Sequence, residues 1–202
     1  MASNTYAPFG FRESRLYGAA PSNYAMQATQ IAYNNSNKIA FGDPVKLLST
    51  GYIDVMTVSG STIHGIFLGC EYYDPVLQNF QFLKSWPAPG TLTSSQTVSA
   101  HVAVDPLMRL QVQVNGGPVV QGNVGNNIDI FSGSSGNPSA AGISQCAVDF
   151  STIASTSTLP FRIVGIVQNG GYNGTSWYAP GNTNNIVEVV MNTSDITSRT
   201  GI

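Results

Sequence analysis

The chain has 202 residues, of which 42% are hydrophobic and only 9% are charged, and its formal net charge is -2. This length is enough to bury a sizeable core, but Ser, Thr, Asn, Gln and Gly must supply most of the polar surface, because a typical protein has about 25% charged residues. Eight Lys plus Arg against ten Asp plus Glu leave no basic stripe, which excludes binding to nucleic acid through phosphate neutralisation. A surface with so little charge is easily buried against another protein, and this favours assembly.

Neither a targeting signal nor a membrane-spanning segment is evident in the sequence. The first residues contain no apolar run of signal-peptide length, and no later run approaches the roughly 20 apolar residues of a membrane helix. We therefore expect an untargeted, non-membrane protein. Cys70 and Cys146 lie far apart in the apolar contexts "IFLGCEYY" and "ISQCAVDF". Without a secretion signal they are expected to be two buried thiols rather than a disulfide.

Residues 1–23 differ in composition from the rest of the chain. Gly and Pro interrupt any periodic pattern, yet the segment is rich in large aromatic residues, which a disordered tail would lack. Aromatic rings and arginines on a segment that cannot form its own core are typical of an arm that docks on another protein. The alternative is an arm that folds back on its own domain. The residues expected to contact a partner are Tyr6, Pro8, Phe9, Phe11, Arg12, Arg15 and Tyr17.

Residues 24–202 are expected to form a single β-rich domain. Short segments rich in Val, Ile, Phe, Tyr and Thr follow one another, separated by Gly, Pro, Asn or Ser. Residues 109–114, "RLQVQV", alternate apolar with Gln, as in an antiparallel strand with one face in water. Residues 161–167, "FRIVGIV", indicate a central strand, and only 144–155 carries a weak helical signal. The pattern predicts an all-β fold, an antiparallel sandwich, jelly roll or distorted barrel with an extended N-terminal arm.

Three Asp-Pro pairs, which begin at Asp43, Asp74 and Asp105, are spaced 31 residues apart. The positions around them do not agree with one another, as the core positions of a structural repeat would. Asp readily accepts hydrogen bonds from the amides that follow it, and Pro fixes the next backbone φ. We interpret each pair as a point at which one strand ends or the next begins.

Few residues in the sequence suit catalysis or metal binding. His64 and His101 each lie alone in a strand pattern, without partners at metal-ligand spacing, and are expected to be structural. The acidic residues are scattered singly, and the sequence contains neither a nucleophile-elbow nor a phosphate-loop motif. Two carboxylates from distant loops that meet for glycoside hydrolysis are a minor alternative. We expect no enzyme activity, no catalytic residues, no cofactor and no metal site.

Trp86, Trp177 and Tyr178 lie in loops rich in Pro and Gly. Large rings in such loops either cover the end of a core or form an exposed platform that stacks on sugars. The first interpretation is structural. The second leads to an alternative function, a receptor- or glycan-binding β domain.

Six short elements occur in order along most of the chain, and together they resemble the head decoration, or capsid cement, proteins of tailed bacteriophages. The resemblance implies a β-rich fold without enzyme activity on the outside of the phage head, where it bridges neighbouring major capsid subunits and stabilises the shell. It supplies no catalytic residues, and only residues 7–12 are carried over, as a contact segment. The elements are "YAPFGFR", "FGDPVKL", "GIFLGC", "WPAPGT", "VAVDP" and "RIVGIV".

The residues and the resemblance lead to the same expected function, a virion structural protein on the capsid exterior that is present in the host cytoplasm during assembly. The expected partners are the major capsid protein and other copies of the chain, as a homodimer or homotrimer, with no nucleic acid and no membrane. Many modest contacts repeated by icosahedral symmetry would hold the lattice together. The alternative is the receptor- or glycan-binding domain, attached to the virion.

Overall fold

The computed structural model describes residues 4–16, 26–57, 62–88, 90, 92–93, 96–167 and 182–197. These residues form twelve labelled β-strands and one 3-10 turn, η1 (Gln121–Asn123), with no α-helix among them. The strands make two six-stranded sheets, each of which closes on itself. The all-β prediction is confirmed, in the form of distorted barrels. Within the described residues, no helix has the length and apolar character needed to cross a membrane.

The first sheet, here called the β2–β7 barrel, has the strand order β3-β4-β2-β7-β5-β6 and is closed by pairing of β3 with β5. Its long strand β5 pairs with β7 and β3 and also carries β6 as an additional edge strand. A separate apolar core fills the barrel, including Phe67 and Trp86. The strands are β2 (Met26–Ile31), β3 (Pro44–Leu47), β4 (Ile53–Val55), β5 (Gly65–Asp74), β6 (Asn79–Leu83) and β7 (Val98–Ala103).

The second sheet, here called the β8–β12 barrel, has the order β1-β8-β10-β9-β11-β12 and is closed by pairing of β8 with β12. β1 comes from the N-terminal segment and pairs antiparallel with the first half of β8, whose last residues pair with β10. Phe11 and Phe161 belong to its core. The strands are β1 (Arg12–Leu16), β8 (Met108–Asn115), β9 (Asn127–Ile130), β10 (Val148–Ala154), β11 (Phe161–Ile166) and β12 (Ile186–Met191).

The strands of the structure agree with the sequence-based expectations except at two places. In β8, Leu110, Val112 and Val114 are buried, as the alternation predicts. Gln113, which was expected to face water, is only 3% exposed, because residues of the N-terminal segment cover it. The weak helical signal over residues 144–155 is wrong, since this region contains strand β10. β11 lies between β9 and β12, as a central strand should.

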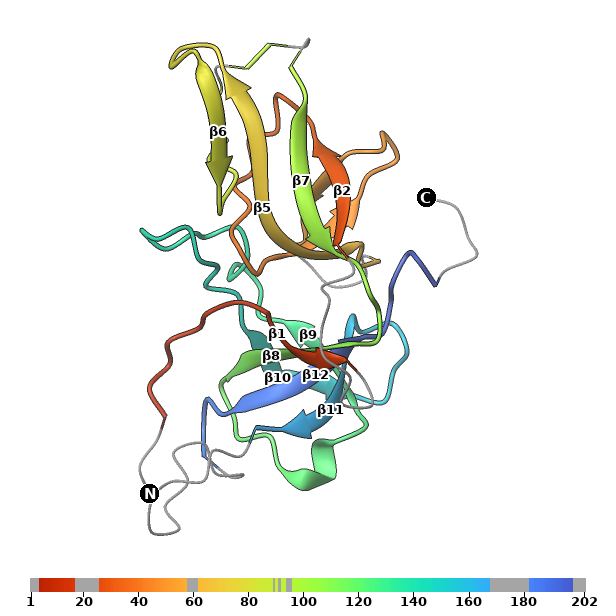
Figure 1. Ribbon diagram of the computed structural model, residues 1–202. Helices are drawn as coiled ribbons and strands as arrows, with labels where there is room; N and C mark the ends of the chain where they lie inside the picture. Colours follow the sequence, from red (N-terminus) through yellow and green to blue (C-terminus); the bar gives the residue numbers. More distant parts are fainter. Residues whose placement is uncertain are drawn as a thin grey trace.

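The structure divides the chain differently from the expected arm, residues 1–23, and single domain, residues 24–202. Residues 12–16 of the arm are a strand of the β8–β12 barrel, and the rest of the chain is shared between two barrels with separate cores. Figure 1 shows the two barrels one above the other, with the connection after β9 running between them. The arm boundary itself lies in residues 17–25, outside the described residues.

Candidate binding surfaces

The junction between the barrels is built around Asp43, which is fully buried directly before β3. Its Oδ2 accepts hydrogen bonds from the amides of Ala40 (2.8 Å) and Gly136 (3.0 Å), and its Oδ1 accepts one from the Ser144 hydroxyl (2.5 Å). Gly136 and Ser144 belong to the connection between β9 and β10, in the other barrel. Burial raises the pKa of Asp43 to about 6, although the three hydrogen bonds act in the opposite direction. Through its hydrogen bonds to Gly136 and Ser144, the carboxyl group of Asp43 links the two barrels.

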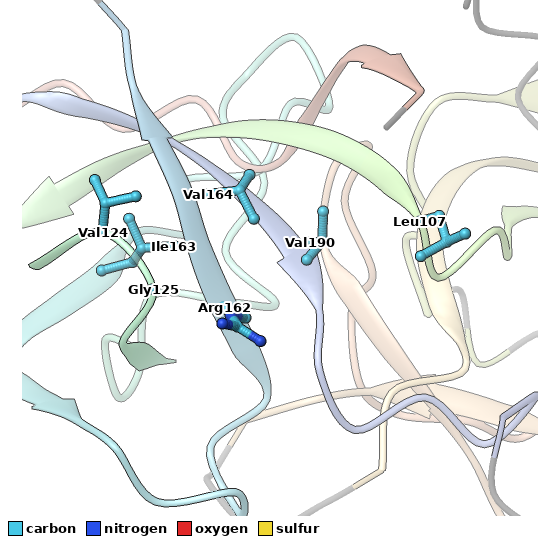
Figure 2. A pocket seen from close by; sticks show the side chains of 7 residues that line it. All are labelled: Leu107, Val124, Gly125, Arg162, Ile163, Val164 and Val190. Atoms are coloured by element: carbon cyan, nitrogen blue, oxygen red, sulfur yellow. The ribbon is translucent and has the colours of Figure 1, made fainter. Parts of the chain in front are cut away.

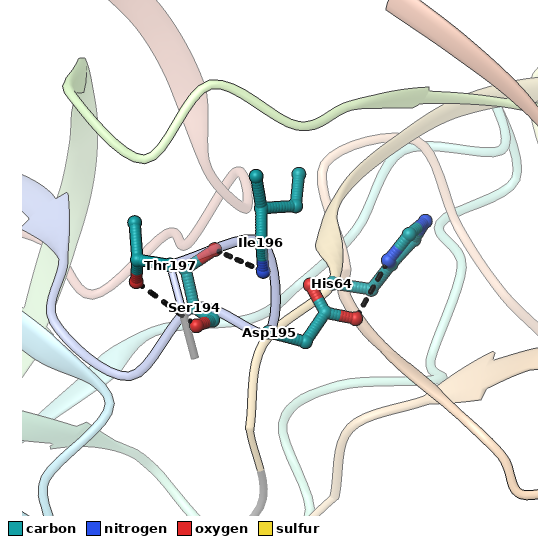
Figure 3. A network of polar contacts seen from close by, with 5 residues as sticks. All are labelled: His64, Ser194, Asp195, Ile196 and Thr197. Carbon is teal, nitrogen blue, oxygen red and sulfur yellow. Dashed lines mark hydrogen bonds and ion pairs between the residues drawn. The ribbon is translucent and has the colours of Figure 1, made fainter. Parts of the chain in front are cut away.

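A second polar contact joins the barrels between His64, just before β5, and Asp195, after β12. His64 Nδ1 lies 2.8 Å from Asp195 Oδ2, and both side chains are nearly buried. Figure 3 shows this pair beside Ser194, whose backbone oxygen accepts a hydrogen bond from Thr197 Oγ1. His64 Nε2 has no hydrogen-bond partner among the described residues. The pair joins the segment before β5 to the segment after β12.

Phe11, which lies in the "APFGFR" segment directly before β1, is part of the protein's own core. The ring is 1% exposed and stacks on Phe161, with ring centroids 4.3 Å apart. Its amide donates a hydrogen bond to the Gly42 oxygen (2.9 Å). The expectation that the Phe11 side chain contacts a partner is therefore corrected, because that ring is enclosed between strands of the same chain.

Arg12 is also engaged within the chain. Its guanidinium carbon lies 4.5 Å from the centroid of the Phe41 ring, and its Nε donates to the Phe9 oxygen (3.2 Å). Pro8 and Phe9 are half-buried, and Tyr6 is 40% exposed. Among the expected contact residues whose side chains the structure describes, Tyr6 therefore presents the most exposed ring. The backbone of Arg15 lies in β1, while its side chain and the whole of Tyr17 fall outside the described residues.

Trp86, expected either to cover a core or to bind sugar, is fully buried in the β2–β7 barrel. Its ring packs edge-on against Tyr72, with centroids 5.5 Å apart, and its Nε1 donates to the Asn35 oxygen (3.1 Å). This placement contradicts the sugar platform for Trp86, because no face of the ring reaches the surface. Trp177 and Tyr178 lie outside the described residues.

Among the described residues, the most exposed aromatic rings lie on the hairpin of β5 and β6. Its turn is formed by the second Asp-Pro pair, where Asp74 Oδ1 accepts hydrogen bonds from the amides of Val76 (2.8 Å) and Leu77 (3.1 Å). The turn closes with Gln78 at a φ of 54°. β5 and β6 then pair in unbroken register from the Asp74–Asn79 pair onward. Figure 1 shows this hairpin at the outer side of the β2–β7 barrel.

Five apolar side chains on this hairpin are exposed, and we call them the hairpin patch. Phe80 and Phe82 are 67% and 72% exposed on the same face of β6, two residues apart. Tyr73 of β5 lies opposite Phe80 and packs edge-on against it, with centroids 5.5 Å apart. Exposed apolar clusters of this kind mark interaction surfaces. The members are Tyr73 (41%), Val76 (70%), Leu77 (62%), Phe80 and Phe82.

The sequence indicates the strand that carries the hairpin patch, but it does not indicate that the phenylalanines of this strand are exposed. Residues 79–83, "NFQFL", alternate polar with apolar as a strand does. The same alternation would arise if the two phenylalanines faced the core. Only the fold shows that this face of β6 is directed away from the barrel interior.

A surface pocket of about 380 Å³ lies beside β11 in the β8–β12 barrel. Figure 2 shows its wall of aliphatic side chains, with Arg162 as the single charged residue among those drawn. No carboxylate, histidine or thiol lines it. The pocket lacks the pair of groups that acid–base chemistry needs. The lining residues are Leu107, Val124, Gly125, Arg162, Ile163, Val164 and Val190.

The two thiols are unsuited to chemistry. Cys70 and Cys146 are free and buried, which confirms the expectation drawn from their apolar contexts. Burial raises the pKa of Cys70 to about 12 and raises that of Cys146 still further. In the part of the chain that the structure describes, no three His, Cys, Asp or Glu residues are grouped so that they could hold a metal ion.

No family model, curated protein or solved structure matches this chain. Function is therefore inferred from the residues and their geometry. The feature that the described residues offer for this inference is the exposed hairpin patch, on a chain that carries few charges.

Proposed function

We propose that the protein is a structural component of a tailed-phage virion, a decoration or cement protein that binds the outside of the head and bridges major capsid subunits. The observation that carries this proposal is the hairpin patch. Its phenylalanines are about two thirds or more exposed although they lie in a regular, fully paired hairpin. Because the backbone that carries these rings is already ordered by pairing with β5, little backbone freedom is lost when a partner covers them.

The chemistry of the hairpin supports a protein surface as its partner. Residues 75–83 contain no charged side chain, and Glu71 of β5, opposite Phe82, is the nearest cross-strand charge, so covering the rings requires little charge to be desolvated. Asn79 and Gln81 alternate with the rings along β6 and therefore point to its other face. Clustered aromatic residues with few charges around them are typical of the centre of a protein interface.

The N-terminal segment has a smaller part in this proposal than the sequence suggests. Phe11 and Arg12 serve the fold, whereas Tyr6 remains exposed beside the half-buried Pro8 and Phe9. We propose that Tyr6 forms a secondary contact with the capsid. Since each site is modest, stabilisation of the shell comes from many copies bound at once.

The proposal is tested by adding the purified protein to phage heads that lack it. We expect the protein to co-sediment with the heads, to saturate at a fixed number of copies per capsid, and to raise the temperature at which the heads burst. Heads that bind no protein, or that burst at the same temperature with and without it, would contradict the proposal. Binding to a glycan surface without binding to heads would favour the receptor-binding alternative instead.

A further inference from the structure

The strand β6 has an open edge. Within the described residues it pairs with β5 alone, and Figure 1 shows it on the side of β5 away from β7. Alternate residues of such a strand carry N–H and C=O groups that have no partner in the sheet. Natural proteins usually protect an open edge with Lys, Pro or a bulge, but residues 79–83 contain neither residue and their register with β5 is regular.

The sequence of β6 is nearly symmetric about its centre. Gln81 is flanked by Phe80 and Phe82, and these by Asn79 and Leu83. If a second β6 pairs antiparallel about Gln81, each Gln81 faces its own copy and each Phe80 faces a Phe82. Aromatic pairs directly opposite each other on neighbouring strands stabilise a sheet. A second copy of the chain therefore matches this edge better than an arbitrary strand does.

We propose that the chain forms a two-fold dimer through antiparallel pairing of β6 with β6, centred on Gln81. The two hairpins then form one four-stranded ribbon. The Phe80 and Phe82 rings of both copies lie on one face of it, where each Phe80 is flanked by Tyr73 and each Phe82 by Glu71 of its own hairpin. Pairing uses the edge of β6 and leaves this face open.

The charges near the strand are compatible with the two-fold arrangement. Lys84, the nearest charged residue after β6, lies opposite the uncharged Gln78 of the other copy in this register. The two Lys84 residues are six positions apart along the paired strands, or roughly 20 Å at the usual rise per residue. No like charges are brought together, so the dimer has no electrostatic penalty at its centre.

The size of the contact determines how tight the dimer is. Five strand residues from each copy bury less than the ~1,200 Å² typical of stable complexes, so a dissociation constant in the micromolar range is expected. Such a dimer is only partly formed in dilute solution. It becomes complete where copies are held close together.

The test is sedimentation of the full chain from about 1 µM to about 500 µM, a range chosen for a weak interface. We expect wild type to change from monomer to dimer within it. Gln81→Lys and Gln81→Glu each place two like charges at the two-fold axis and should remain monomeric, whereas an equal mixture of the two should dimerise again. Gln121→Lys, at an exposed position of η1 in the other barrel, is the matched control and should dimerise like wild type.

A second variant tests the same axis without adding charge. In Gln81→Cys the paired Cα atoms would lie about 4.5–5.5 Å apart, which suits a disulfide, and mild oxidation with oxidised glutathione should give a covalent dimer. Gln121→Cys should give little. A chain that stays monomeric at every concentration, a trimer, or a dimer that Gln81→Lys and Gln81→Glu leave unchanged would overturn the proposal. No phage heads are used, so this outcome is independent of the capsid experiment.

Discussion

The amide of Phe11 donates a hydrogen bond to the carbonyl oxygen of Gly42 (2.9 Å), which joins two sequence elements that lie 31 positions apart. The first element, "APFGFR", was expected to contact a partner, and the second, "FGDPVKL", to mark the start of a strand. In the fold they meet at the junction of the two barrels, where Arg12 also covers the Phe41 ring. Both elements therefore have a structural role in holding the barrels together.

We predict that Gly42→Ala weakens this junction. Gly42 has a φ of +92°, and an added Cβ would lie 2.9 Å from the Phe11 oxygen. Gly51 has a similar φ of +82° but nothing within 4 Å of an added Cβ, so Gly51→Ala measures backbone strain alone. Gly42→Ala should lower the free energy of unfolding by at least about 1 kcal/mol more than Gly51→Ala does, as measured by urea denaturation. Equal losses would show that the close approach has no energetic importance.

Asp43 should make stability depend on pH in a defined direction. Because its folded-state pKa of about 6 is above its ordinary value of 3.8, the folded protein binds a proton more readily than the unfolded chain. The stabilisation is complete below the unfolded pKa and is lost as the pH rises through 6. Relative to Asp43→Asn, which cannot titrate, wild type should gain about 2 kcal/mol in unfolding free energy from pH 7 to pH 4. Parallel pH profiles for the two proteins would contradict this.

Substitutions in the N-terminal segment should separate its structural and contact roles. Phe11→Ala removes a buried ring that stacks on Phe161 and should cost about 3–5 kcal/mol of stability. Tyr6→Ala should leave stability nearly unchanged, because its ring is 40% exposed, and should weaken capsid binding. Thermal unfolding and head co-sedimentation distinguish the two effects. A stable Phe11→Ala protein that fails to bind heads would restore the arm to its expected role as a contact.

The sequence allowed the all-β fold to be predicted, but not its division into two barrels. Strand positions follow from local alternation, and the Asp-Pro interpretation is confirmed: Asp43 precedes β3, Asp74 ends β5, and Asp105 lies between β7 and β8. Closure depends on the distant pairs β3–β5 and β8–β12, which no local pattern specifies. The exposure of Phe80 and Phe82 could not be predicted either, because the alternating sequence of β6 does not show which face of the strand meets the core.

Binding to the capsid is expected to be nearly insensitive to salt. Two carboxylates lie near the hairpin patch: Asp74 accepts hydrogen bonds from amides of its own turn, and Glu71 of β5 lies opposite Phe82. Between about 50 mM and 500 mM NaCl, co-sedimentation with heads should change by less than about twofold, because screening acts on charges that this contact hardly uses. Release of the protein as salt rises would indicate an ionic contact elsewhere on the surface.

The central claim, that the hairpin patch binds the capsid, is tested most directly by the affinity of Phe80→Ser/Phe82→Ser for heads lacking the protein. The matched control, Met26→Ser/Leu107→Ser, removes two apolar side chains of comparable exposure, 60% and 61%, away from the hairpin. We expect the phenylalanine variant to fold normally and to bind about 100-fold more weakly, with the control unchanged. Wild-type affinity in the phenylalanine variant would contradict the account.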